Sequence, residues 1–185
     1  MAMPTAARDW TAQMVRELPE DGNRYEVVGG VLLVTPSPAR PHQAAITQLM
    51  APLIKYLEPL GHLPTLYVSP SDISWAPDVL VQPDIFVVAP DEVTADWSAV
   101  KTLLLAIEVL SPSTRRHDRV TKRAAYECFG VATYWIVDHE ARAVEVWHPG
   151  DATPEIVTGV LRWQIAPDAP VLEIALPELF ARLPR

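Results

Sequence analysis

The sequence predicts an α/β fold: a mixed β-sheet flanked by helices, with a β-hairpin near the N-terminus. Two observations support this prediction. Residues 103 to 138 contain an apolar run, a helical stretch and a second β-rich run in succession, which is typical of a βαβ unit. Gly29 and Gly30 separate two other β-rich runs, and paired glycines supply the positive φ angles of a tight turn.

The first half of the chain begins with a short helix over residues 10–18, which stops at Pro19. The hairpin follows over 24–36. A long helix is expected over 41–61, because apolar residues recur there at helical intervals and Gly61 suits its end. Pro52 is expected to kink this helix. Residues 65–88 read as short strands, with prolines at the strand ends.

The second half has a polar loop over residues 91–100 and then an apolar strand over 103–110. A helix runs from Ser113 or Thr114, either of which suits the cap, to about Phe129, and Gly130 closes it. Strands follow at 133–138 and 143–148, then a small C-terminal sheet and a last helix at 177–183. We expect one domain over 1–185, with a core at about 24–147 and a C-terminal extension at 148–185.

Composition narrows the class of protein. The chain has 185 residues, 49% of them hydrophobic, and a single cysteine, Cys128, so it can bury a core but form no internal disulfide. A reducing, cytoplasmic location is therefore expected. No apolar run reaches the roughly 18 residues of a membrane helix, so no membrane partner is expected. A net charge of −8 argues against a broad nucleic-acid-binding surface.

Two carboxylates interrupt strand patterns. Asp84 follows Gln82-Pro83, and Glu108 lies inside the apolar strand 103–110. Their separation leaves room for a loop and a return strand, so the two side chains could lie side by side in the sheet. Paired carboxylates suit Mg²⁺ or Mn²⁺. Alternatively, Asp84 caps a turn and Glu108 pairs with an arginine, and the sequence leaves both alternatives open.

Cations are concentrated after this strand. Lys122 lies in the second turn of the following helix, from which its side chain can reach back towards Glu108. Five of the 15 basic residues fall within nine positions: Arg115, Arg116, Arg119, Lys122 and Arg123. Arg115, Arg119 and Lys122 have i, i+4, i+7 spacing, which predicts one shared helix face that can bind phosphates. The alternative is a solvated face paired with Asp118 and Glu127.

Several motifs together resemble a known family. They are "YE" at 25–26, "QPD" at 82–84, "EVLSPST" at 108–114, the downstream Lys122 and "GVATYWIVD" at 130–138. They resemble the Uma family of bacterial endonucleases, which belongs to the restriction-endonuclease-like PD-(D/E)XK superfamily. The resemblance implies a restriction-endonuclease-like fold, hydrolysis of phosphodiester bonds in DNA with Mg²⁺ or Mn²⁺, and a homodimer.

The resemblance also implies roles for single residues. Asp84 and Glu108 would hold the metal, helped by the main-chain carbonyl of Val109, and Glu26 would be an acidic residue contributed by an earlier element. The superfamily pattern has a lysine two residues after the glutamate, where this chain has Leu110, and Lys122 fits the description of a relocated lysine.

Four further residues are expected to bind the substrate: His42, Arg115, Arg119 and Arg123. His42 either lines the site, as a histidine commonly does at this place in the resembling family, or is simply a polar residue at a helix start. Three tryptophans could cover the dimer interface: Trp75, Trp147 and Trp163.

The leading hypothesis is a Mg²⁺-dependent DNA endonuclease that uses Glu26, Asp84, Glu108 and Lys122. The alternatives are a catalytically inactive nucleic-acid-binding or assembly module with the same fold, and a hydrolase of small phosphoesters.

Overall fold

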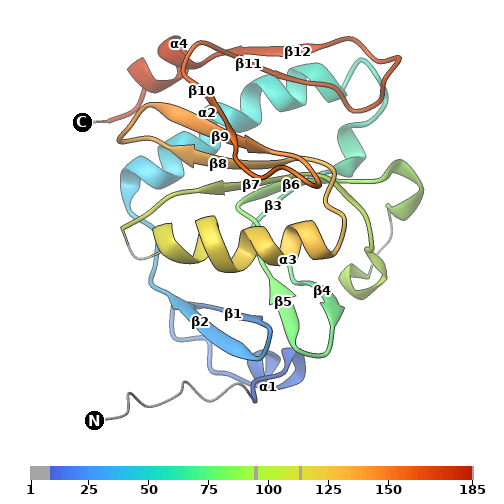
Figure 1. Cartoon of the computed structure of the whole chain (residues 1–185), viewed down its shortest axis with the longest axis vertical. Coiled ribbons are helices and arrows are strands. Elements are labelled where there is room, and N and C mark those ends of the chain that lie inside the picture. Colours follow the sequence, from blue (N-terminus) through green and yellow to red (C-terminus); the bar gives the residue numbers. More distant parts are fainter. Residues whose placement is uncertain (1–8, 94–95, 113, 185) are drawn as a thin grey trace.

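The computed structural model describes residues 9–93, 96–112 and 114–184. Within these ranges a six-stranded mixed sheet lies at the centre of the molecule, with helices on both of its faces (Figure 1). Its order is β10-β9-β8-β7-β6-β3. The strands are β3 (Leu66–Val68), β6 (Ile85–Val88), β7 (Leu103–Val109), β8 (Tyr134–Asp138), β9 (Ala143–Trp147) and β10 (Glu155–Val157). The predicted mixed α/β fold is therefore confirmed.

The βαβ unit is formed by β7, the helix after it and β8. β7 and β8 are parallel, with Glu108 opposite Ile136, whereas the other neighbouring pairs of this sheet are antiparallel. A strand between two neighbours with helices on both faces must be apolar on both sides, which explains the continuous run at 103–107.

A smaller four-stranded sheet, in the order β2-β1-β5-β4, contains the predicted hairpin. Its strands are β1 (Arg24–Val28), β2 (Val31–Thr35), β4 (Ile73–Ala76) and β5 (Val79–Val81). The turn between β1 and β2 has φ angles of 57° at Gly29 and 74° at Gly30, which glycine adopts without a steric penalty. The short helix α1 (Ala12–Arg16) packs against this sheet.

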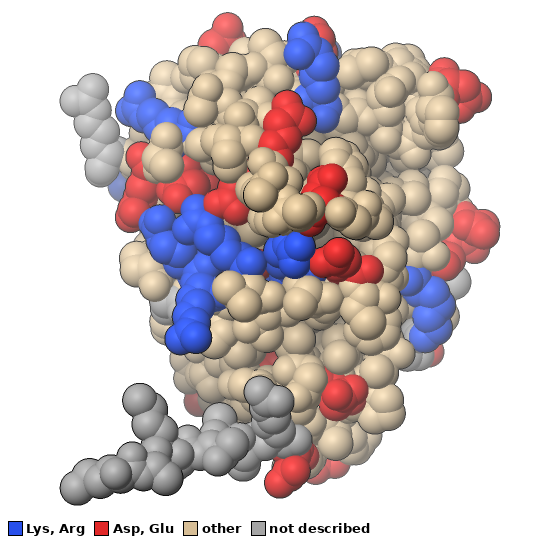
Figure 2. All heavy atoms as spheres, in the orientation of Figure 1, with Lys and Arg blue, Asp and Glu red and all other residues tan. Residues whose placement is uncertain are grey.

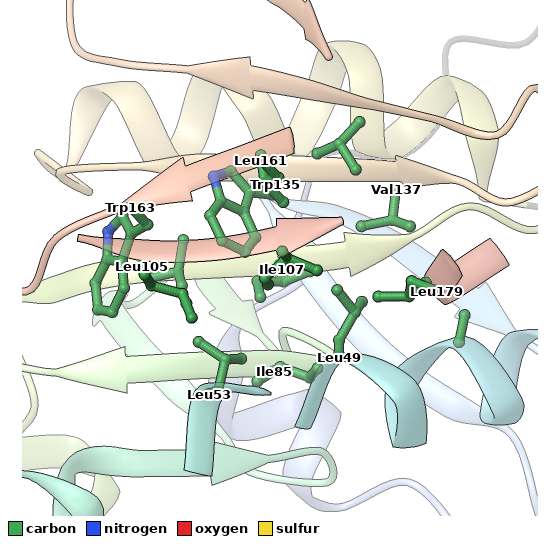
Figure 3. Close-up of a cluster of buried hydrophobic side chains, with 14 of the residues drawn as sticks. Leu49, Leu53, Ile85, Leu105, Ile107, Trp135, Val137, Leu161, Trp163 and Leu179 are labelled. Carbon is green, nitrogen blue, oxygen red and sulfur yellow. The ribbon is translucent and has the colours of Figure 1, made fainter. Parts of the chain in front are cut away.

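On one face of the central sheet the core lies under α2 (Arg40–Leu57). Leu49, Leu53 and Leu57 of α2 are fully buried, and Figure 3 shows Leu49 and Leu53 directed towards Ile85, Leu105 and Ile107. The helix continues through Pro52 and ends four residues before Gly61. The same core contains residues of β11 (Val160–Trp163), β12 (Leu172–Ala175) and α4 (Leu176–Ala181). This shared core supports the proposal of one domain that includes the C-terminal extension.

The helix after β7 covers the other face (Figure 1). It contains a π-helical segment, η4 (His117–Lys122), followed by α3 (Arg123–Cys128), and Gly130 closes it with a φ of 71°. At its start Thr114 N–H donates to Ser111 Oγ and Ser111 N–H donates to Thr114 Oγ1, at 3.3 and 3.2 Å. This reciprocal arrangement resembles a capping box, so Ser111 shares the cap with the expected Thr114. Ser113, the other expected cap, lies outside the described residues.

Three 3₁₀ turns complete the elements: η1 (Leu63–Thr65), η2 (Pro90–Glu92) and η3 (Trp97–Ala99). The three tryptophans considered for an interface pack within the chain: Trp75 stacks on Phe129, Trp163 meets Tyr56 edge-on, and Trp147 lies under Arg123. Among the described helices, none has both the length and the apolarity that crossing a bilayer requires.

Candidate active site

The pairing of β6 with β7 places Asp84 beside Glu108. Ile85 lies opposite Ile107 in this antiparallel pair, so the residue before β6 falls next to the end of β7. Asp84 is also bonded to β7 itself, because the backbone N–H of Val109 donates to Asp84 Oδ2 at 2.8 Å. On β7, Ile107 and Val109 face the core under α2, and Glu108 therefore faces the helix on the other side.

The β1 strand brings a third carboxylate and a cation to the same place. Arg24 and Glu26 share one face of β1 because side chains repeat every two residues along a strand. Arg24 Nη1 lies 2.7 Å from Asp84 Oδ1 and donates to the carbonyl of Gln82 at 3.3 Å. Glu26 Oε1 accepts from the backbone N–H of Gln82 at 2.7 Å, so β1 is tied to the segment that carries Asp84.

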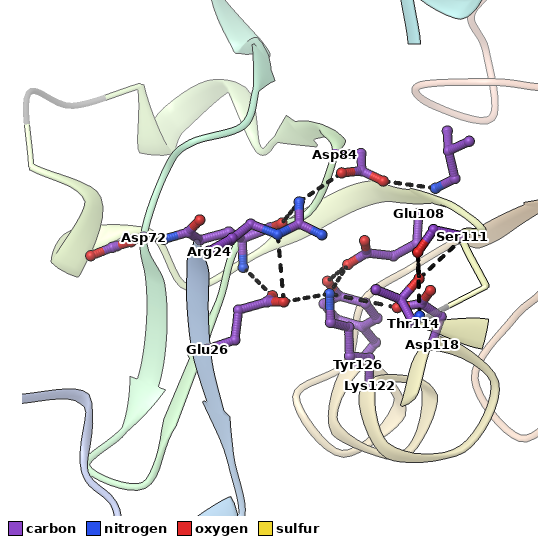
Figure 4. Close-up of polar contacts among 12 residues, drawn as sticks. Arg24, Glu26, Asp72, Asp84, Glu108, Ser111, Thr114, Asp118, Lys122 and Tyr126 are labelled. Atoms are coloured by element: carbon purple, nitrogen blue, oxygen red, sulfur yellow. Dashed lines mark hydrogen bonds and ion pairs between the residues drawn. The ribbon is translucent and has the colours of Figure 1, made fainter. Parts of the chain in front are cut away.

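Lys122 lies at the centre of these acids (Figure 4). Its ammonium is 2.8 Å from Glu26 Oε2, 3.0 Å from Glu108 Oε1 and 3.6 Å from Asp118 Oδ1. Lys122 is the last residue of the π-helical segment, and such segments are frequent at functional sites. Lys122 thus contacts Glu108, as expected. Leu110 is buried in the apolar core and offers no polar group.

Two further side chains orient the strand-borne acids. The Tyr126 hydroxyl donates to Glu108 Oε1 at 2.8 Å. His42, in the first turn of α2, has Nε2 3.1 Å from Asp84 Oδ2 and is only 6% exposed. The structure therefore places His42 in the acid cluster, which favours the first of its two interpretations.

The ionisation of this cluster is strongly perturbed. Burial raises the pKa of Glu108 well above its ordinary value, although Lys122 opposes the shift. Burial would also raise the pKa of Asp84, but the hydrogen bond from His42 and the charge of Arg24 outweigh it and the pKa falls. For Lys122, burial would lower the pKa, but Glu108, Glu26 and Asp118 together raise it. The cluster thus holds a charged lysine among acids of unequal strength.

The cluster contains more acid than base. Four carboxyl groups, each about 1% exposed or less, meet two permanently cationic side chains within the described part of the chain: Glu26, Asp84, Glu108 and Asp118 against Arg24 and Lys122. Asp118 Oδ1 lies 3.6 Å from the Lys122 ammonium, which is beyond hydrogen-bond distance. Buried carboxylates that repel one another favour a proton or an additional cation.

The oxygen donors present are chemically suited to Mg²⁺ or Mn²⁺. However, no three His, Cys, Asp or Glu side chains among the described residues are gathered as a ready-made metal site. The reason is visible in Figure 4, in which Arg24 lies between Asp84 and Glu26, and Lys122 between Glu26 and Glu108. The donor chemistry fits a divalent ion, and Arg24 and Lys122 form ion pairs with the same acids.

The prediction that Arg115, Arg119 and Lys122 share one basic helix face is wrong for Lys122. Lys122 is buried, whereas the side chains of Arg115 and Arg119 are 39% and 32% exposed and point elsewhere. Arg115 and Arg119 reach carboxylates at the end of β8 and on β9, whereas Lys122 reaches Glu26 and Glu108.

The surface arginines form ion pairs. Arg115 pairs with Asp138 and Glu140 at 3.1 and 2.8 Å, and Arg119 with Asp138 and Glu145 at 3.2 and 2.6 Å. Figure 2 shows Lys and Arg side chains gathered on this face with acidic side chains beside them. A third arginine, Arg123, forms an ion pair with Glu127 at 3.1 Å, as the solvated-face alternative predicts. Any phosphate bound here must compete with carboxylates.

Sequence reasoning missed three members of the site. Arg24 was detectable as a cation two residues before Glu26 on the same strand face. Asp118 and Tyr126 each lie four residues from Lys122, a spacing that can bring side chains together on a helix. None of these signals shows by itself that the side chain is buried.

Comparisons with known proteins identify the family and the fold. The family model Uma2, described as "Putative restriction endonuclease", matches residues 12–178. A solved structure described as "a putative nuclease belonging to DUF820 from Anabaena variabilis" is similar, with a TM-score of 0.76 and 17% identity over 93% of this chain and 98% of that chain. At this identity the likeness shows the fold. A comparison with curated proteins finds no match.

Proposed function

We propose that this chain, which belongs to the Uma2 family, is a divalent-metal-dependent endonuclease that hydrolyses phosphodiester bonds in DNA. Family membership confirms the resemblance found in the motifs and indicates a nuclease. The observation that supports the finer proposal is the position of Lys122: its ammonium lies 3.0 Å from Glu108, although it comes from the following helix and not from the strand position held by Leu110.

In this proposal Asp84, Glu108 and the carbonyl of Val109 hold Mg²⁺ or Mn²⁺. A bound metal supplies charge that polarises the scissile phosphate and lowers the pKa of a coordinated water. The chain orients the ligands, because the N–H of Val109 and the ring of His42 fix Asp84 Oδ2, and Tyr126 fixes Glu108.

Lys122 carries three N–H donors and no acceptor. It therefore stabilises negative charge that develops on the phosphate or orients the attacking water, as a preorganised donor in a site closed to bulk solvent. Glu26 keeps the ammonium in place through its 2.8 Å contact. Arg115, Arg119 and Arg123 contribute to phosphate binding at the surface, with an affinity that falls steeply with salt.

The test is cleavage of supercoiled plasmid with Mg²⁺ or Mn²⁺. We expect nicking by the unmodified chain, loss of nicking in Lys122→Arg, and retention in Lys101→Ala, which alters a lysine before β7, outside the acid cluster. Lys122→Arg keeps the positive charge that the buried acids need, so we expect it to fold. Circular dichroism checks this. Binding of Mn²⁺, followed by calorimetry, should be lost in Asp84→Asn.

A second candidate is an inactive nucleic-acid-binding or assembly module. It is favoured by the near-complete burial of the acid cluster and by the ion pairs that engage Arg115 and Arg119. If the folded chain with either metal leaves double-stranded DNA, single-stranded DNA and RNA uncut, this second function replaces the first. Cleavage of model diesters without cleavage of polynucleotides would instead indicate a small-phosphoester hydrolase.

The proposal includes a homodimer that acts in the cytoplasm. Nothing in the packing of the tryptophans supports the dimer, because each contacts other residues of its own chain. Light scattering coupled to size-exclusion chromatography tests it: a mass near 20.5 kDa would contradict the dimer, and twice that value would support it.

A further inference from the structure

We propose that Arg24 is an internal counter-ion of Asp84 that competes with a divalent ion for this carboxylate and must leave it when the ion binds. The inference rests on the proposed function and deepens it, because it assigns a competitor to the metal among the side chains of this chain. No motif singled out Arg24, and its role follows from three contacts and its exposure.

The contacts of Arg24 are those expected of a metal substitute. Its guanidinium lies 2.7 Å from Asp84 Oδ1, 3.3 Å from the carbonyl oxygen of Gln82 and 3.8 Å from Glu26 Oε2. Two carboxylates and a main-chain carbonyl are also the kinds of oxygen that Mg²⁺ and Mn²⁺ accept as ligands. Of these three contacts, Asp84 is the one that Arg24 shares with the ligands proposed for the metal.

The oxygens of Asp84 show which contact has to break. Oδ2 accepts from the backbone N–H of Val109 and lies 3.1 Å from His42 Nε2, and both of these groups are held by buried elements. Oδ1 is engaged by Arg24. A metal that takes Asp84 as a ligand therefore gains a free lone pair most readily at Oδ1, once the guanidinium has moved.

Exposure indicates that Arg24, and not Lys122, is the group that moves. The side chain of Arg24 is 18% exposed, whereas those of Lys122, Glu26 and Asp84 are 1–2% exposed. Arg24 can turn its charge into water without opening the core, because a long arginine side chain keeps its stem packed while its head is solvated. Lys122 has no such route, because its side chain is only 1% exposed.

Electrostatics gives the direction of the effect. A guanidinium a few ångströms from a divalent ion repels it, so the resident arginine weakens metal binding. Replacing Arg24 with the neutral Gln removes this repulsion and leaves Asp84 without its guanidinium partner. Both consequences favour a metal in the cluster.

The experiment is a calorimetric titration with Mn²⁺ of the full chain, of Arg24→Gln and of the control Arg162→Gln. Arg162 is an exposed arginine that pairs with Glu173 on β11 and β12, away from the acids. We expect Arg24→Gln to bind Mn²⁺ about tenfold more tightly or better. We expect Arg162→Gln to match the unmodified chain. Mn²⁺ should also raise the melting temperature of Arg24→Gln more than that of the unmodified chain.

A second measurement keeps the inference testable if Arg24→Gln does not fold. The ¹⁵N-labelled unmodified chain is titrated with Mg²⁺, and the Nε–H resonance of Arg24, assigned by comparison with Arg24→Lys, is followed beside that of Arg162. We expect the Arg24 resonance to shift as the metal binds and the Arg162 resonance to stay. An Arg24 resonance that stays at saturating Mg²⁺ overturns the inference.

Different results would contradict the role of Arg24 and the metal dependence of the proposed function. If the unmodified chain binds Mn²⁺ and Arg24→Gln binds it equally or more weakly, Arg24 is not a competitor and the metal site itself stands. If neither binds Mn²⁺, the metal dependence of the proposed function fails, and the inference fails with it. Loss of binding in Arg24→Gln/Asp84→Asn supports Asp84 as the shared ligand.

Discussion

Replacing Lys122 with Met is the most demanding test of the acid cluster. Methionine has nearly the same length but carries no charge. The ammonium it removes is 2.8 Å from Glu26 and 3.0 Å from Glu108, in a side chain only 1% exposed. Removing one partner of a buried ion pair costs about 3 to 5 kcal/mol. For a chain of this size, the melting temperature should fall by about 6 to 20 °C.

The loss of stability in Lys122→Met should depend on pH. Burial raises the pKa of Glu108, with Lys122 opposing, so removing Lys122 raises it further. An acid whose pKa is raised on folding contributes stability below its unfolded value of 4.5, and this contribution is lost as pH rises through the folded value. The variant should therefore lose less stability at about pH 4 than at about pH 8, because at the lower pH Glu108 is mostly protonated in the folded and in the unfolded chain.

The assay is urea unfolding followed by circular dichroism at both pH values, since the free energy falls linearly with denaturant. The matched control is Lys55→Met, the same substitution at an exposed lysine on α2. The reasoning is refuted if Lys122→Met stays within about 1 kcal/mol of Lys55→Met at neutral pH, which is the effect of a surface pair.

Three further predictions use the same unfolding assay. Tyr126→Phe removes a buried donor 2.8 Å from Glu108 and should cost about 1 to 3 kcal/mol; an unchanged midpoint would contradict this bond. Leu53→Ala, at a fully buried position of α2, should cost about 2 to 5 kcal/mol. The adjacent Ile54→Ala, at a position 37% exposed, should cost much less, and equal losses would show that the helix faces are misassigned. Burial alone would raise the pKa of Asp84, but the neighbouring imidazole and guanidinium lower it, so the unmodified chain should lose stability as pH falls below 3.8. Asp84→Asn should lose less over this range, and parallel pH curves would argue against a charged Asp84.

Much of the fold was predictable because its signals are local. The turn of the hairpin needs positive φ angles, and Gly29 and Gly30 adopt them. The helical spacing of Leu49, Leu53 and Leu57 marks the buried face of α2. The π-helical segment escaped prediction, because six residues that look α-helical in sequence widen their turn only in the folded chain.

The candidate site was predictable in part. Glu108 stood out because a carboxylate is unexpected inside an apolar strand, and Lys122 followed from its place in the second turn of the next helix. Arg24 did not stand out, because a charged residue at the start of a strand is common on protein surfaces. Its partner Asp84 lies 60 positions away, and only strand pairing brings the two together.

By itself the sequence determined the order and type of the main elements and the motifs that place the chain in its family, because turn angles, hydrophobic periodicity and motif spacing act over short stretches of backbone. Only the tertiary structure decided which cation meets which acid. Arg24, His42 and Lys122 come from three different elements. Each lies within 3.1 Å of Asp84 or Glu108, and these polar contacts are strong because the packed sheets and helices exclude water from the space between the side chains.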